Sequence, residues 1–246
     1  MNERPLVEAL GDETLSPYRR YLSLFVGKQT LGALAKYEFY TAVLGRLPGA
    51  LGYFVRGKCY PGLLGSVGPG TVFGAGGIIR CPSRIHLGRG VMIDDYVVLD
   101  AKGASSLIVL GDQILLGRNS ILTCNDSAMS IGNFVSIGPF CFLVSRSHLT
   151  IGSNVAIGAG THMLGGGHAY DDPDMPVIHQ ARVSKGITVE DGAWIGIGAK
   201  ILDGVTIGRN SIVGAGAVVS KDVPPWTVVL GNPARVVEKR KQVNGS

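Results

Sequence analysis

The sequence is poor in aromatic and in charged residues, which make up 7% and 17% of its 246 positions. So few aromatic residues do not suit a wide mixed core, whereas 37 glycines favour a narrow structure with many tight corners. No stretch of roughly 18 apolar residues is free of charge, so we expect no transmembrane helix. The start, M-N-E-R-P-L-V-E, lacks a basic segment followed by an apolar run, so we expect no signal peptide.

The four cysteines form neither a C-x-x-C pair nor a spacing typical of metal ligands. Cys141 falls at a position of a repeat where small residues recur, so we interpret it as a packing residue. We interpret the four as free thiols in a reducing cytosol, and we expect the protein to be cytoplasmic. They are Cys59, Cys81, Cys124 and Cys141.

Positive charge is concentrated near the N-terminus. Residues 16–60 contain seven Lys or Arg against one acid, Glu38. The net charge of this segment, +6, exceeds the net charge of +5 of the whole chain. The remainder is close to neutral. A basic stripe for nucleic acid along the rest of the molecule is therefore not supported.

Residues 189–224 consist of six consecutive six-residue units in strict phase. A small or β-branched residue stands at the fifth place of each unit, and an aliphatic residue opens each one. The opening residues are Val189, Ile195, Ile201, Ile207, Val213 and Val219. A fixed internal period of this kind is typical of a solenoid, in which each unit covers the apolar face of the next.

The same phase extends backward through the chain, and three units make one coil. The pattern predicts an all-β solenoid, a parallel β-helix of about seven coils whose opening aliphatic residues point inward. The predicted coils are 67–84, 87–104, 110–127, 131–148, 151–168, 189–206 and 207–224. The pair Pro224-Pro225 predicts the end of the repeat.

One long insert, residues 169–188, interrupts the repeat directly after His168. A long loop that leaves a rigid scaffold is a common place for function. Three glycines precede His168. By the period alone, His148 and His168 hold equal positions one coil apart, so we expect them to stack about 5 Å apart. His162 is predicted at another corner.

The segment before the repeat predicts helices. Ser16 is a suitable helix cap with Pro17 behind it, and an amphipathic pattern continues to about residue 43. A second short apolar segment, 50–55, follows. Two roles remain open for this appendage: it caps the exposed end of the β-helix, or its basic face rests on an anionic membrane surface. Three regions follow from the pattern: 1–62, 63–230 with its insert, and a basic tail at 231–246.

Several motifs resemble those of the hexapeptide-repeat acyltransferases. They are G-H-A-Y-D-D-P-D-M-P, D-G-A-W-I-G-I-G-A-K, I-V-G-A-G-A-V-V-S-K-D-V-P-P and G-N-P-A-R-V. Over roughly 67–237 the chain resembles this family, and within it is similar to the maltose/galactoside and surface-polysaccharide O-acetyltransferases. The resemblance implies a left-handed helix, a homotrimer with active sites between neighbouring prisms, and acetyl-CoA lying along the solenoid. The general rule for parallel crossovers would have given the right hand.

The resemblance also implies roles for single residues. His168 matches the catalytic histidine, and an imidazole suits removal of a proton from an acceptor hydroxyl near neutral pH. Asp171 and Asp172 are candidate acceptor-binding residues, and no metal is required. Candidate CoA-binding residues are Trp194, Gly196, Ile197, Ala215, Ser220, Lys221 and Arg235. Many polysaccharide-type relatives carry H-x-H where this chain has Gly166 before His168, so acceptor choice is expected to differ.

The resulting hypothesis is a CoA-dependent O-acetyltransferase acting on a sugar hydroxyl in a surface polysaccharide, its precursor or a related glycoside. It would work in the cytoplasm, with possible contact to the inner membrane face through residues 16–60. Three alternatives remain. The acceptor is an amine of an amino sugar or xenobiotic; the protein is a metal-dependent enzyme like the γ-class carbonic anhydrases, using His162 and His168; or it is a non-enzymatic scaffold.

Overall fold

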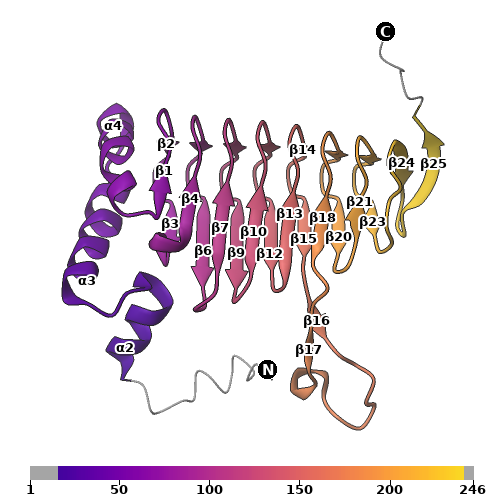
Figure 1. Ribbon diagram of the computed structural model, residues 1–246, viewed down its shortest axis with the longest axis horizontal. Helices are drawn as coiled ribbons and strands as arrows, with labels where there is room; N and C mark the ends of the chain where they lie inside the picture. The colour runs from indigo at the N-terminus through magenta and orange to yellow at the C-terminus, as the bar shows by residue number, and fades with distance from the viewer. Residues whose placement is uncertain (1–15, 241–246) are drawn as a thin grey trace.

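The computed structural model describes residues 16–240, which form a parallel β-solenoid with helices at its N-terminal end (Figure 1). Successive strands go to three sheets in rotation, so each turn of the chain adds one parallel strand to each sheet. The first and third sheets contain seven parallel strands each and the second contains eight, which confirms the predicted parallel β-helix of about seven coils. Within the described residues, none of the helices has the length and apolar character needed to span a bilayer.

The strands of the three sheets are short, because each side of a coil is only one strand long. The first sheet contains β1 (Ser66–Val67), β4 (Ile85–Leu87), β7 (Leu107–Leu110), β10 (Ala128–Ile131), β13 (His148–Ile151), β18 (Ile187–Val189) and β21 (Thr206–Ile207). The second contains β2 (Val72–Phe73), β5 (Met92–Ile93), β8 (Leu115–Leu116), β11 (Ser136–Ile137), β14 (Ala156–Ile157), β19 (Trp194–Ile195), β22 (Ile212–Val213), β24 (Thr227–Leu230) and β25 (Arg235–Lys239). The third contains β3 (Ile78–Arg80), β6 (Val98–Lys102), β9 (Ile121–Asn125), β12 (Phe142–Ser145), β15 (His162–Leu164), β20 (Lys200–Leu202) and β23 (Val218–Val219).

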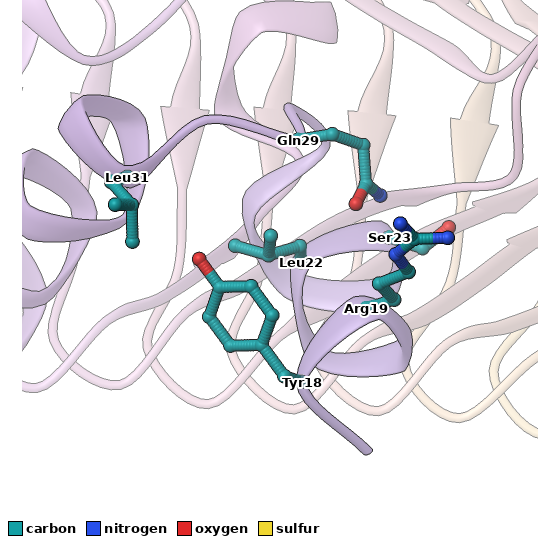
Figure 2. Close-up of a pocket in the computed structure, with 6 residues that line it drawn as sticks. All are labelled: Tyr18, Arg19, Leu22, Ser23, Gln29 and Leu31. Carbon is teal, nitrogen blue, oxygen red and sulfur yellow. The ribbon is translucent and has the colours of Figure 1, made fainter. Parts of the chain in front are cut away.

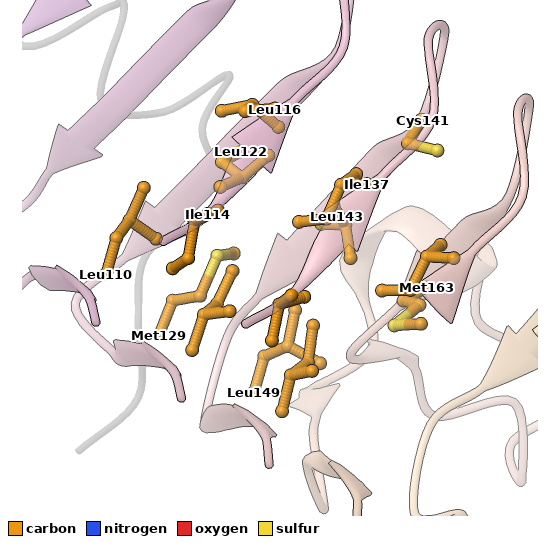
Figure 3. Packing of buried hydrophobic residues seen from close by; sticks show 14 of the residues in the cluster. Leu110, Ile114, Leu116, Leu122, Met129, Ile137, Cys141, Leu143, Leu149 and Met163 are labelled. Atoms are coloured by element: carbon orange, nitrogen blue, oxygen red, sulfur yellow. The ribbon is translucent and has the colours of Figure 1, made fainter. Parts of the chain in front are cut away.

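Register between coils places each opening aliphatic residue on its counterpart. Ile151 pairs with Val189, and Val189 pairs with Ile207. These side chains are fully buried, as predicted, and Figure 3 shows Leu122 and Leu143 from adjacent coils directed into the same interior. Because side chains alternate along a strand, one inward residue per side is enough to build a continuous apolar column.

A ladder of side chains ties together the corner between the first and second sheets. Asp112 accepts a hydrogen bond of 2.8 Å from the backbone N–H of Arg89, and Asn133 accepts one of 2.8 Å from Asp112. The hydroxyl of Ser153 continues the ladder by accepting from the backbone N–H of Asn133. The carboxylate of Asp191 extends it further by accepting from the backbone N–H of Ser153. These bonds satisfy corner N–H groups, so the coils stay in register where no strand pairs them.

The cysteines in the solenoid behave as packing residues. Cys141 is buried with no disulfide partner, which confirms the interpretation made from its place in the repeat. Burial raises its pKa, and burial also raises the pKa of Cys124 to about 12. A thiol with a raised pKa carries little thiolate at neutral pH, so these cysteines are poor nucleophiles.

The N-terminal region is a series of short helical segments, which confirms the predicted helical appendage. Ser16 does cap the first one, since its Oγ accepts from the N–H of Arg19. Gly27, with φ of 74°, then ends this stretch in the left-handed conformation, and Thr30 caps a new helix. The segments are α2 (Pro17–Tyr21), η1 (Leu22–Val26), α3 (Leu31–Glu38), η2 (Phe39–Val43), η3 (Leu44–Arg46), α4 (Gly49–Cys59) and η4 (Tyr60–Gly62).

These helices cover the exposed end of the first coil. The hydroxyl of Tyr37 donates to the carbonyl oxygen of Ile79 at 2.9 Å, and the Nε of Arg56 donates to that of Phe73 at 3.1 Å. The side chain of Arg56 is only 2% exposed. The capping role left open by the sequence is therefore present, since the helices pair backbone groups of the first coil that would otherwise face solvent.

At the C-terminal end the repeat continues beyond the two prolines, so the predicted stop at Pro224-Pro225 is wrong. Val223 bridges Ile207, and β24 then pairs in parallel with β22 before β25 folds back in antiparallel. The prolines lie between the bridge and β24, where no strand hydrogen bond needs their missing N–H groups.

The predicted stacking of His148 on His168 is also wrong. His148 opens β13, and the next coil presents Gly186 to it, where an added Cβ would lie 2.2 Å from the imidazole ring. His168 has left the stack by that point and belongs to a separate hairpin. The period predicted a corner position, but the insert moved the residue away from the column.

Core burial predicts a contrast between two leucines of one coil. We expect Leu122→Ala, at a fully buried position, to lower the free energy of unfolding by about 2–5 kcal/mol, because it leaves a cavity that rigid neighbouring coils cannot fill. Leu115→Ala, at a position 42% exposed, should change it by less than about 0.5 kcal/mol. Urea unfolding of both variants measures the difference, and equal effects would contradict the packing described.

Candidate active site

A two-stranded antiparallel hairpin projects from the solenoid at the corner between the third and first sheets of the fifth coil (Figure 1). Its strands are β16 (Gly167–His168) and β17 (Arg182–Val183), and its tip contains η6 (Val177–His179). Asp203 anchors the returning strand, because its carboxylate accepts from the N–H of Lys185 at 2.7 Å and that of Gly186 at 2.9 Å. The hairpin therefore holds a fixed position on the column.

His168 lies at the base of this hairpin and is half-buried. Its Nδ1 lies 3.4 Å from the carbonyl oxygen of Gln180, at the long end of a hydrogen bond. A carbonyl oxygen only accepts, so this contact favours the tautomer with a proton on Nδ1. The Nε2 atom then carries a lone pair, which is the arrangement that a general base needs.

Gln180 connects this contact to the rest of the loop. Its side chain is buried, and its Nε2 donates to the carbonyl oxygens of Asp172 and Met175, both at 2.8 Å. Its Oε1 accepts from the N–H of Asp172 at 3.3 Å. One residue therefore orients the imidazole through its backbone and fixes the loop through its amide. This role could not be predicted from the sequence, because the repeat pattern says nothing about residues inside an insert.

Arg182 is a second functional candidate that the sequence did not reveal. It lies directly across the hairpin from His168, and its Nε is buried without a hydrogen-bond partner among residues 16–240. A cation in that place could meet negative charge on a bound substrate. The anchoring role of Asp203 was also not predicted. The sequence does contain a signal for it, because Asp203 is an acidic residue directly before a glycine at a corner position.

A second group of predicted residues lies at the corner between the second and third sheets of coils six and seven. Trp194 is 56% exposed on β19, and Ile197 follows it at 65%. Gly196 lies against the next coil, since an added Cβ would come within 2.5 Å of the backbone nitrogen of Ala215. The structure therefore brings Gly196, Ile197 and Ala215 together in two adjacent coils.

Beside this group runs a strip without side chains, which we call the glycine track: Gly160, Gly198 and Gly216. An added Cβ would meet nothing within 4 Å at any of the three positions, so the strip faces open space. The corresponding corner positions of earlier coils carry Tyr96 and Phe140, both 60% exposed. Asn119 holds the position in coil three, and an added Cβ on Gly76 of coil one would meet the ring of Tyr96, so the consecutive glycines of coils five to seven form the smooth path along this corner.

Of the remaining predicted residues, Ser220, Lys221, Asp171 and Asp172 do not join that group within one chain, whereas Arg235 pairs with Leu230, which lies on Gly214 beside Ala215. Ser220 and Lys221 are exposed at the corner between the third and first sheets of coil seven, the same corner that carries the hairpin in coil five. Arg235 is exposed on β25, and Asp171 and Asp172 are exposed in the hairpin loop. The face of the third sheet thus separates His168 from the glycine track of its own chain.

The hairpin leaves large apolar side chains in solvent. Tyr170 is 80% exposed, and Val177 and Ile178 are 51% and 52% exposed. These side chains have little of their own chain to pack against, because the hairpin stands away from the column (Figure 1). A large exposed apolar surface of this kind is typical of a contact with another protein surface.

Comparison with known proteins connects this geometry to a family. The family model for the bacterial transferase hexapeptide (six repeats) matches residues 186–221, which form coils six and seven. A galactoside O-acetyltransferase of Escherichia coli (strain K12) is 41% identical over 102 residues, or 39% of this chain and 47% of that protein. The predicted resemblance to the hexapeptide-repeat transferases is confirmed. The chain spans less than half the length of the curated relatives that it matches.

Solved structures share the fold. The polysialic acid O-acetyltransferase OatWY superposes with a TM-score of 0.53 at 19% identity, covering 73% of this chain and 90% of that one. AntD, an N-acyltransferase from Bacillus cereus solved with dTDP and coenzyme A, gives a TM-score of 0.50 at 20% identity, covering 73% and 86%. Both are acyltransferases by name, one acting on oxygen and the other on nitrogen.

The contacts of Gln180 predict a local effect. We expect Gln180→Ala to remove the two 2.8 Å bonds and to speed hydrogen exchange and proteolytic cleavage in the loop by roughly 30-fold, at about 1 kcal/mol for each bond. The stability of the solenoid should stay unchanged. His179→Ala, at an exposed neighbour in the same loop, is the matched control. A Gln180 variant whose loop is as protected as the parent would contradict this role.

Proposed function

We propose that the protein is a CoA-dependent acetyltransferase that acts on a hydroxyl group of a sugar, in a surface polysaccharide, its precursor or a related glycoside. The observation that carries the proposal is the setting of His168: a projecting hairpin holds it, a backbone carbonyl faces Nδ1, and Nε2 is left as a base. The similarity to a galactoside O-acetyltransferase supports oxygen as the acceptor atom.

The chemistry follows from that base. Acetyl-CoA supplies an acetyl group on a thioester. His168 takes the proton from the acceptor hydroxyl through Nε2 as the oxygen attacks the thioester carbonyl, and it returns the proton to the departing thiolate. The Gln180 carbonyl, which accepts from Nδ1–H, stabilises the imidazolium formed in between. No metal ion is needed for this step, because the imidazole handles the proton and backbone N–H groups can steady the oxyanion.

The CoA path would follow the glycine track. Ile197 and Ala215 border an open strip of backbone that a pantetheine arm can approach closely. Trp194 supplies an exposed indole beside it, and Arg235 a cation that suits a phosphate. Ser220 and Lys221 lie at the other corner and would reach the donor only from a neighbouring chain.

A homotrimer would complete the site. Within one chain the third sheet separates the histidine from the glycine track, whereas a neighbouring prism could bring its own track to the hairpin of the first chain. The exposed Tyr170, Val177 and Ile178 support such a contact, because a partner would cover them. Asp171 and Asp172, exposed at the same loop, would then border the acceptor. We place the reaction in the cytoplasm, where free cysteines such as Cys59 stay reduced.

The role of His168 predicts a specific loss. We expect His168→Ala to lower kcat by about 10²–10⁴-fold with glycoside acceptors while CoA binding and unfolding stay unchanged, because only the proton transfer is removed. His86→Ala, in the second coil and far from the hairpin, is the matched control. Thioester consumption against a panel of glycosides and amino sugars measures the effect and separates hydroxyl from amine acceptors. Full activity of the His168 variant would overturn the proposal.

A further inference from the structure

The helical cap carries exposed apolar side chains on its outer side. On α3 and η2, Leu31 is 74% exposed, Phe39 53% and Val43 50%. On α4, Leu51 is 68% exposed and Phe54 64%. We call these five residues the outer apolar face. Their size and exposure are unusual for a solvated helix surface, where isolated apolar residues are the norm.

The outer apolar face points away from the solenoid. At about 100° per residue, Leu51 and Phe54 lie roughly opposite Arg56, the buried residue that bonds to the first coil. On α3, the buried Tyr37 bonds to the first coil, and the exposed Leu31 and Phe39 lie on the other side of the helix. The helices stand at one end of the column, so nothing of the described chain covers this side (Figure 1).

The helical cap that carries the outer apolar face is basic. The ammonium group of Lys58 lies 5.8 Å from the centre of the Phe54 ring, and Lys28 and Arg46 are exposed on the same cap, beside hollows that reach the first coils. The single acid between residues 16 and 62 is Glu38, and its carboxylate accepts from the hydroxyl of Tyr21. Within residues 16–62, the rim therefore has cations without exposed anions to balance them.

A hollow of about 660 Å³ adjoins this face through Leu31. Arg19, Ser23 and Gln29 line one part of it, and Figure 2 shows the side chains of Arg19 and Gln29 gathered near Ser23, with Leu31 across the hollow. Polar donors beside an apolar wall match a molecule with a charged head and a hydrocarbon body.

We propose that the outer apolar face and its basic rim dock the protein onto the surface of a bilayer that contains anionic lipids. Apolar side chains would enter the boundary between headgroups and acyl chains, the rim would lie among the phosphates, and the hollow beside Leu31 would receive a headgroup. A second copy of this chain is a poorer occupant, because two such caps facing one another would bring like charges together. The inference is independent of acetyl transfer.

The test uses the full chain and vesicle cosedimentation. We expect binding to vesicles that contain phosphatidylglycerol, weaker binding to pure phosphatidylcholine vesicles, and release as salt is raised. The double variant Leu51→Ser, Phe54→Ser should weaken binding by at least about tenfold, because it removes two buried apolar side chains. Lys58→Gln and Arg19→Gln should each weaken it by roughly fivefold on anionic vesicles.

Matched controls lie at the opposite end of the column. Val236 and Val237 are 54% and 55% exposed on β25, so their double serine variant changes similar exposed apolar surface without touching the cap. It should bind vesicles like the parent. The proposal is overturned if the parent does not bind anionic vesicles. It is also overturned if the cap variant and the Val236, Val237 control bind these vesicles with equal affinity. It is also overturned if Leu51→Ser, Phe54→Ser lowers the oligomeric mass without vesicles, since a second copy would then cover the face.

Discussion

The contact on which the rest of the structure depends is the stacking of one aliphatic side chain on its counterpart in the next coil. Pairs such as Ile151 on Val189 and Val189 on Ile207 repeat along each sheet and leave no room for a change of register. A slip of one residue would turn the whole inner row outward. The column is therefore rigid, and variation is confined to corners and ends, where the hairpin and the cap are found.

The sequence was informative where the structure is periodic. The hexad phase predicted the buried positions around Leu122 and Ile201, and local capping chemistry predicted the start of α2 at Ser16. It failed where tertiary contacts decide. The period alone cannot show that three glycines lead His168 out of the stack, or that the buried amide of Gln180 ties the loop together.

The two predicted halves of the site illustrate the same limit. Motif matching grouped His168 with Ile197 and Ala215, and the structure puts them on different corners of one prism. His168 lies at the corner between the third and first sheets, and the glycine track lies at the corner between the second and third sheets. These two corners of one three-sided column cannot face one another. The proposed reaction therefore requires a neighbouring chain, because the rigid column keeps the imidazole and the glycine track of one chain apart.

The most direct measurement is a structure of the assembled protein with CoA bound. It should show the pantetheine arm against the glycine track of one chain, beside Ile197 and Ala215, with its thiol close to the Nε2 of His168 from the adjoining chain. CoA bound at another surface, or an imidazole at 168 directed away from every subunit boundary, would contradict the account.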